Sequence, residues 1–196
     1  TELSVRVKRL QNLGLQLNMA RGRPSPAQLD LANPMLVLPG SADYQSSENL
    51  DCRTYGGTDG LPEMKQLFSG ILECAEVNIV IGGNSSLAMM HDALVRAYVW
   101  GASGGDTPWR EQGTIRFLCP APGYDRHFLI SELLGFEMLP VEMTDTGPNM
   151  DQVESLALDP SVKGIWCVPR YSNPTGVTYS DSVVERLASM QAAPDF

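Results

Sequence analysis

Basic residues, histidines and long apolar runs are scarce in this chain of 196 residues. Its 14 lysines and arginines are outnumbered by 23 aspartates and glutamates, which gives a formal net charge of −9. Proteins that bind nucleic acid need clustered Lys and Arg to displace phosphate counterions, so we expect no nucleic-acid partner. The two histidines, His91 and His127, stand too far apart in the sequence to indicate a metal site.

No run of residues approaches the roughly 20 apolar residues that a helix needs to cross a bilayer. Residues 1–10 also lack the apolar stretch of a secretory signal. The four cysteines form no Cys-x-x-Cys pair, and Cys119 and Cys167 each end an apolar run typical of a buried strand. We therefore expect reduced thiols in a cytoplasmic protein that has no membrane partner.

The spacing of apolar residues divides the chain into two regions. Residues 1–15 predict an amphipathic helix, and the prolines of residues 17–50 exclude long regular elements there. Further along, helices are predicted over residues 61–74, 86–100, 126–134, 150–158 and 180–190, and strands over 78–81, 114–119, 136–141 and 163–168. This alternation indicates an α/β fold, a three-layer sandwich with a mainly parallel sheet. Residues 193–196 lead towards a further strand, so we expect a longer protein.

Ligands of such sheets collect at the carboxyl ends of the strands, which directs attention to the loops that follow them. After residues 78–81 two glycines turn the chain, and Asn84, Ser85 and Ser86 open a helix. The free N–H groups and positive dipole end of a helix N-terminus favour an anion, and Gly83 lets it approach the backbone. Helix capping without any ligand explains the same residues equally well. The pattern matches neither a P-loop nor Gly-x-Gly-x-x-Gly, which disfavours ATP and NAD.

The loops after the next two candidate strands carry an aromatic ring and an amide. Prolines and a glycine fix Tyr124 at a strand end, where its ring could stack on a flat ligand or simply join the core. Asn173 precedes Pro174, so its amide could donate a hydrogen bond in a fixed direction. The same four residues, 173–176, also suit an ordinary surface turn.

Taken together, these segments resemble the fold-type I aminotransferases of the aspartate aminotransferase superfamily, which depend on pyridoxal 5'-phosphate (PLP). The sequence of residues 21–25, Arg-Gly-Arg-Pro-Ser, is most similar to that of the divergent aspartate aminotransferase branch called subgroup Ic. The resemblance implies that Asn173 bonds the 3-oxygen of PLP, that Tyr124 stacks on its ring and that His127 orients an acidic group beneath it. It assigns the cofactor phosphate to four residues: Gly83, Asn84, Ser85 and Ser86.

Two further residues take their roles from the same resemblance. Residues 55–63 are similar to the family segment whose tyrosine, here Tyr55, reaches the phosphate of the neighbouring subunit, which implies a homodimer. Residues 17–31 resemble the substrate-side strand, with Gly22 lining the substrate site. Residues 1–50 would then belong to a small domain, and residues 51–196 would form the N-terminal part of the PLP-binding large domain.

The family's chemistry needs a lysine that forms a Schiff base with PLP. The chain has Lys8, Lys65 and Lys163, and none stands where the family places its lysine, well after Asn173. We therefore expect no catalytic residue in this chain and no transamination by it alone. The full-length protein is expected to transfer an amino group between an amino acid, aspartate or another dicarboxylic one, and a 2-oxo acid. The alternatives are a PLP-binding lyase or decarboxylase, and a non-catalytic PLP-fold regulatory domain.

Overall fold

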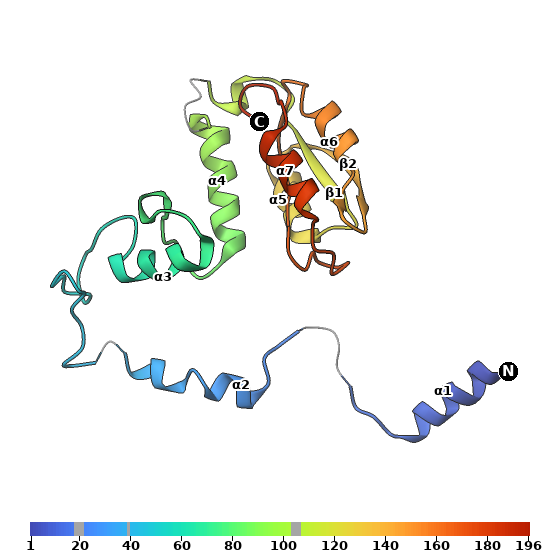
Figure 1. Cartoon of the computed structure of the whole chain (residues 1–196), viewed down its shortest axis with the longest axis horizontal. Helices are drawn as coiled ribbons and strands as arrows, with labels where there is room; N and C mark the ends of the chain where they lie inside the picture. The colour runs from blue at the N-terminus through green and yellow to red at the C-terminus, as the bar shows by residue number, and fades with distance from the viewer. Residues whose placement is uncertain (18–21, 39, 103–106) are drawn as a thin grey trace. The chain divides into compact units, whose positions relative to one another are not determined.

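The computed structural model of the chain describes residues 1–17, 22–38, 40–102 and 107–196 (Figure 1). These residues form two compact units, Thr1–Ile81 and Gly82–Phe196. The domain assignment made above, with its boundary near residue 50, remains a prediction. No helix in the described ranges is both long and apolar enough to cross a membrane.

Short helices joined by irregular chain make up the first unit. Its elements are α1 (Glu2–Asn12), α2 (Pro26–Asp30), the 3₁₀ helix η1 (Asn33–Val37), α3 (Pro62–Leu72) and the 3₁₀ helix η2 (Glu76–Asn78). A capping box starts α2, because the Ser25 hydroxyl accepts from the Gln28 N–H and the Gln28 side chain accepts from the Ser25 N–H. The helix predicted at the N-terminus is confirmed, and the described residues of the proline-rich region contain only short elements, as expected.

The strand predicted over residues 78–81 is wrong. The 3₁₀ helix η2 includes the first of these residues, Asn78, and the Ile79 N–H donates to the Glu76 carbonyl at 3.0 Å, at the end of that helix. The Ile81 N–H donates instead to the Asp59 carbonyl of an irregular loop, at 2.9 Å. Backbone groups that are bonded in these ways cannot join a strand ladder. An apolar run alone does not distinguish this arrangement from a buried strand.

A sheet forms the centre of the second unit. Its strands are β1 (Arg116–Ala121), β2 (Glu137–Thr144), β3 (Gly147–Pro148) and β4 (Val162–Ile165), in the order β3-β2-β1-β4. β1 pairs in parallel with β2 and with β4, and the short β3 is antiparallel to β2. The helices are α4 (Ser86–Trp100), η3 (Trp109–Glu111), α5 (Asp125–Leu133), α6 (Met150–Leu156) and α7 (Asp181–Ser189). The predicted α/β class and mainly parallel sheet are confirmed.

Each face of this sheet carries its own apolar core. Phe117 and Leu118 are neighbours on β1, and successive side chains of a strand point to opposite faces. Leu118 packs in one cluster with residues of the sheet, α6 and α7: Val141, Met150, Val153, Val162, Tyr179 and Val183. Phe117 packs in a second cluster with Ala97 of α4 and with Trp109, Ile115 and Phe136. Helices therefore cover both faces, which gives the three layers expected from the sequence (Figure 1).

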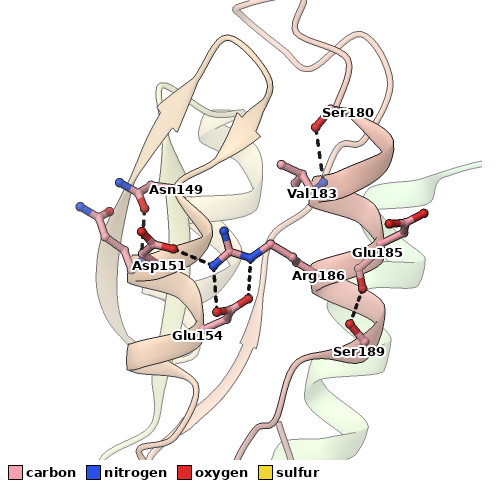
Figure 2. Close-up of polar contacts among 9 residues, drawn as sticks. Asn149, Asp151, Glu154, Ser180, Val183, Glu185, Arg186 and Ser189 are labelled. Atoms are coloured by element: carbon pink, nitrogen blue, oxygen red, sulfur yellow. Dashed lines mark hydrogen bonds and ion pairs between the residues drawn. The ribbon is translucent and has the colours of Figure 1, made fainter.

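An arginine fork connects the two helices that cover one face of the sheet. Figure 2 shows Arg186 of α7 donating to Glu154 of α6 through Nε at 2.8 Å and through Nη2 at 2.9 Å. The same Nη2 donates to the Asp151 carboxylate at 2.7 Å. Both helices also start at side-chain caps, Asn149 for α6 and Ser180 for α7. These polar contacts fix how α6 and α7 lie against each other at the surface.

Replacing Arg186 should reduce the change in stability that the protein undergoes as the pH falls through the acidic range. Hydrogen bonding from Arg186 lowers the pKa of Glu154 below its ordinary 4.5. A carboxyl whose pKa is lower in the folded state stabilises that state above its unfolded pKa, and the contribution disappears as the pH falls through the folded pKa. We expect a lower melting temperature for Arg186→Gln at neutral pH, with the difference from wild type shrinking as the pH falls below about 4.5. Thermal melts across pH test this, with Arg6→Gln in α1 as the charge-matched control; a difference that stayed constant with pH would contradict it.

Candidate functional site

A cavity of about 670 Å³ lies in the second unit, where the chain leaves β1 and β4 and where α4 begins. Four of the residues singled out from the sequence line it together: Ser86, Tyr124, His127 and Asn173. Its lining is completed by Met90, Cys167, Val168, Pro169 and Arg170. Three segments far apart in the sequence therefore meet at one hollow, as expected of a parallel sheet whose ligands bind at the carboxyl ends of the strands.

The N-terminus of α4 forms one wall of this cavity. Ser85 is the N-cap, and its Oγ accepts from the Ala88 N–H at 3.3 Å. The capping explanation is therefore correct for Ser85, although its O–H proton can still be donated. Ser86 lines the cavity, and the first turn of a helix leaves backbone N–H groups without intrahelical acceptors. This end of α4 can bind an anionic group such as a phosphate.

The two glycines before α4 differ in what they allow. A Cβ at Gly82 would lie 2.6 Å from the Met89 side chain, so this position is constrained by packing. A Cβ at Gly83 would meet nothing within 4 Å. The backbone at Gly83 therefore borders open space, which suits the close approach of a ligand. Gly83 and Asn84 lie directly before the cap of α4, and their phosphate contacts remain predictions.

Three aromatic rings contact one another in series, and two of them, Tyr124 and His127, line the cavity. The rings of Tyr124 and His127 meet edge to face, with centroids 5.2 Å apart and an interplanar angle of 88°. His127 in turn lies nearly parallel to Trp166, with centroids 4.7 Å apart and an angle of 14°. The Trp166 Nε1 donates to the Oγ of the fully buried Ser131 at 3.0 Å. Trp166 and Ser131 thus fix the ring on which Tyr124 rests.

Sequence reasoning missed both Trp166 and Ser131. Trp166 lies in an apolar run, where an aromatic residue is explained by the core alone. One available signal was the spacing of His127 and Ser131, because residues four apart share one face of a helix. That signal is weak without a partner, and the partner residue Trp166 directly follows β4, 35 residues away from Ser131.

His127 is expected to be a neutral imidazole under physiological conditions. It is 5% exposed, and burial lowers its pKa below the ordinary 6.5. An NMR titration of the full-length protein, with the signal assigned through His127→Gln, should give a midpoint below 6.5. Because the unfolded state binds this proton more readily, stability should fall as the pH drops through the unfolded pKa. A midpoint above 6.5 would contradict the burial argument.

The loop that carries Asn173 is closed by backbone hydrogen bonds. The Tyr179 N–H donates to the Pro169 carbonyl at 2.8 Å, and the Ser172 N–H donates to the Val177 carbonyl at 2.8 Å. Gly176 has a φ of +76°, a left-handed conformation that glycine adopts without a steric penalty. Asn173 is exposed and lines the cavity from this loop. The arrangement holds an amide at the cavity wall within a bonded frame.

Cys167 lines the cavity but is not a nucleophile in this environment. Burial raises the pKa of its thiol to about 11 and that of Cys119 to about 12. Since the thiolate is the reactive form of cysteine, both groups are protonated and unreactive at neutral pH. Cys167 therefore contributes to the wall of the cavity and does not act as a nucleophile there.

Tyr55 and Gly22 belong to the first unit, and the structure does not place either residue relative to the cavity. The Tyr55 side chain is 99% exposed, and a Cβ at Gly22 would meet nothing within 4 Å. Their roles at a subunit interface and a substrate site remain predictions. Among the lysines, Lys163 is buried with its Nζ 3.8 Å from the Asp195 carboxylate, and it does not line the cavity.

A model of the aspartate amino-transferase family matches residues 1–196. The chain belongs to this family. It is 44% identical over 188 residues to an aspartate aminotransferase of Corynebacterium glutamicum, an alignment that covers 95% of this chain and 44% of that protein. A protein of Mycolicibacterium smegmatis named as an aminotransferase is 50% identical over 191 residues, which is 95% of this chain and 45% of the relative.

The family assignment extends to the three-dimensional structure. The crystal structure of an aspartate transaminase from Corynebacterium glutamicum superposes with a TM-score of 0.90 at 41% identity, covering 100% of this chain and 46% of that chain. The chain therefore spans about half the length of the aminotransferases that it matches. The resemblance inferred from the sequence is confirmed at the level of family and fold.

Proposed function

We propose that the full-length protein is a PLP-dependent aminotransferase and that this chain supplies a large part of its cofactor-binding surface. The observation that carries the proposal is the single cavity lined by Ser86, Tyr124, His127 and Asn173. The family assignment and the relatives at 44% and 50% identity support amino-group transfer as the reaction.

The groups around the cavity fit the parts of PLP one by one. The N-terminus of α4, with Ser86 at the cavity wall, can hold the phosphate. The Tyr124 ring, supported by His127 and Trp166, offers a flat face for the pyridine. The Asn173 amide can donate to the ring oxygen. A cavity of about 670 Å³ is in the usual size range of small-molecule sites.

Bound PLP supplies the electron sink that amino-acid chemistry requires. The residues of this chain that line the cavity would bind and orient it. His127 contributes a neutral imidazole, because burial lowers its pKa. No lysine is among the residues that line the cavity. We therefore assign the proton-transferring lysine, and the groups that bind the substrate carboxylate, to parts of the full-length protein outside this chain.

For the substrates we propose aspartate or another dicarboxylic amino acid together with a 2-oxo acid. The support is the name of the Corynebacterium glutamicum relative, an aspartate aminotransferase. We also propose a cytoplasmic homodimer in which Tyr55, almost fully exposed within this chain, reaches the phosphate site of the neighbouring subunit. Tyr55→Phe in the full-length protein should then weaken PLP binding without changing the dimer mass.

The decisive experiment gives the full-length protein PLP, aspartate and 2-oxoglutarate and measures oxaloacetate and glutamate. Equal amounts of both products, formed only with PLP present, are the expected result. Release of carbon dioxide or ammonia without glutamate would contradict transfer and indicate a decarboxylase or lyase. A shift of the PLP absorbance without any turnover of several amino acids would indicate a regulatory domain instead.

A further inference from the structure

Tyr179 has a buried hydroxyl whose proton no described residue accepts. Its side chain is 5% exposed, and although the Val168 backbone N–H lies close enough to the phenol oxygen to lower its pKa, no described residue offers an acceptor for the hydroxyl proton. The ring packs in the core cluster with Val183, and a Cβ at Gly147 would lie 3.1 Å from its Cγ. Buried hydroxyls are destabilising when unpaired, so nearly all of them bind protein groups or ordered water.

A small second cavity lies against the Tyr179 side chain. Its lining includes Tyr179, Ser172 and Val168 together with Tyr124 and His127. Three of these residues, Tyr124, His127 and Val168, also line the larger cavity of about 670 Å³. The small cavity therefore lies between the larger cavity and the core around Tyr179. Its volume of about 10 Å³ for the centre of a water-sized sphere corresponds to one water molecule.

The chemistry of the lining excludes an ion. The remaining residues around the small cavity are Pro120, Gly123, Phe128, Met143 and Trp166, and none carries a formal charge. Burial lowers the pKa of His127, which keeps its ring neutral. Burial also raises the pKa of the Tyr179 phenol, so this group is a hydrogen-bond donor throughout the neutral range. A neutral ligand of one heavy atom that both accepts and donates is water.

We propose that this cavity binds one water molecule, which accepts the Tyr179 hydroxyl proton and joins Tyr179 to the loop that carries Asn173. Ser172, 3% exposed and adjacent to Asn173 in sequence, brings a second hydroxyl to the same lining. Tyr179 already closes the base of this loop through its bond to the Pro169 carbonyl. Tyr179 is thus a positioning residue that acts on Asn173 through the loop. The water site stands on the geometry alone, and the effect on PLP rests on the proposed function.

The test is Tyr179→Phe in the full-length protein, with Tyr98→Phe, from the opposite core, as the matched control. Loss of a hydroxyl that had no partner would raise the melting temperature, whereas loss of one bonded to a water lowers it. We expect a melting temperature lower than that of the control. A crystal structure of the wild type should show one water about 2.7–2.8 Å from Tyr179 Oη, and the variant should lack it. A raised melting temperature, or a wild-type Oη that donates its proton directly to a protein group, would overturn the water site.

The link to Asn173 has its own readout. We expect Tyr179→Phe to weaken PLP binding several-fold, as measured by titration of the full-length protein with PLP. Unaltered PLP affinity would overturn the link to Asn173. A wild-type protein that bound no PLP would overturn the proposed function and this link together, and the crystal density and the melting temperatures would still decide the water site.

Discussion

Gly123→Ala should produce a protein that is clearly less stable and that binds PLP poorly. A Cβ at this position would collide with the backbone carbonyl oxygen of Pro120 and would lie 2.7 Å from Cζ of Phe128. The Pro120 carbonyl belongs to β1 and cannot move without disturbing the sheet. Overpacking of this kind costs about 1–3 kcal/mol. Any relaxation of the loop displaces Tyr124, the next residue, from the cavity wall.

Denaturant unfolding of the full-length protein measures this effect, and PLP titration measures the displacement of Tyr124. Gly70→Ala in α3 is the control, because a Cβ there meets nothing within 4 Å. Alanine is the better helix former by roughly 0.5–1 kcal/mol, so the control should be as stable as wild type or slightly more so. Equal stability of Gly123→Ala and the control would show that this loop relaxes without cost.

Local signals predicted the helices and the parallel sheet well, because packing and local chemistry agree in them. Helix α4 begins at Ser86 as predicted, since Ser85 is a strong capping residue at the start of an apolar periodic stretch. Strands β1 and β2 lie where apolar runs predicted them, with both faces of β1 buried. In these elements the propensity of the chain and its tertiary contacts favour the same conformation.

The failures occur where a distant partner decides the structure. Residues 78–81 read as a strand, but local turn bonds and the Asp59 carbonyl use their N–H groups. β3 has two residues and exists only because Gly147 and Pro148 pair with the end of β2. Spacing along one chain carries no information about such partners.

The candidate site shows the same division. Its loops were identifiable because Gly, Pro, Asn and Ser follow apolar runs, a pattern that reports backbone turns directly. The stack of His127 on Trp166 and the hydroxyl of Tyr179 were not identifiable, since both depend on side chains packed across the core. The family resemblance assigned roles to residues expected to contact the ligand. It assigned none to the residues that support them from behind, Trp166 and Tyr179.

Asn173→Ala should reduce the affinity for PLP by roughly 10–100-fold, the loss expected when a hydrogen bond to a charged oxygen worth about 1.5–3 kcal/mol is removed. Asn173 is exposed within a loop closed by backbone bonds, so the substitution should leave the melting temperature of the cofactor-free protein unchanged. Asn173→Asp should bind PLP more weakly still, because a carboxylate cannot donate and repels an anionic ring oxygen. Titration of the full-length protein with PLP measures all three affinities, and Asn78→Ala, at the end of η2 in the first unit, is the matched control. If Asn173→Ala bound PLP as tightly as Asn78→Ala, the amide would have no part in holding the ring, and the assignment of this cavity would rest on the helix N-terminus and Tyr124 alone.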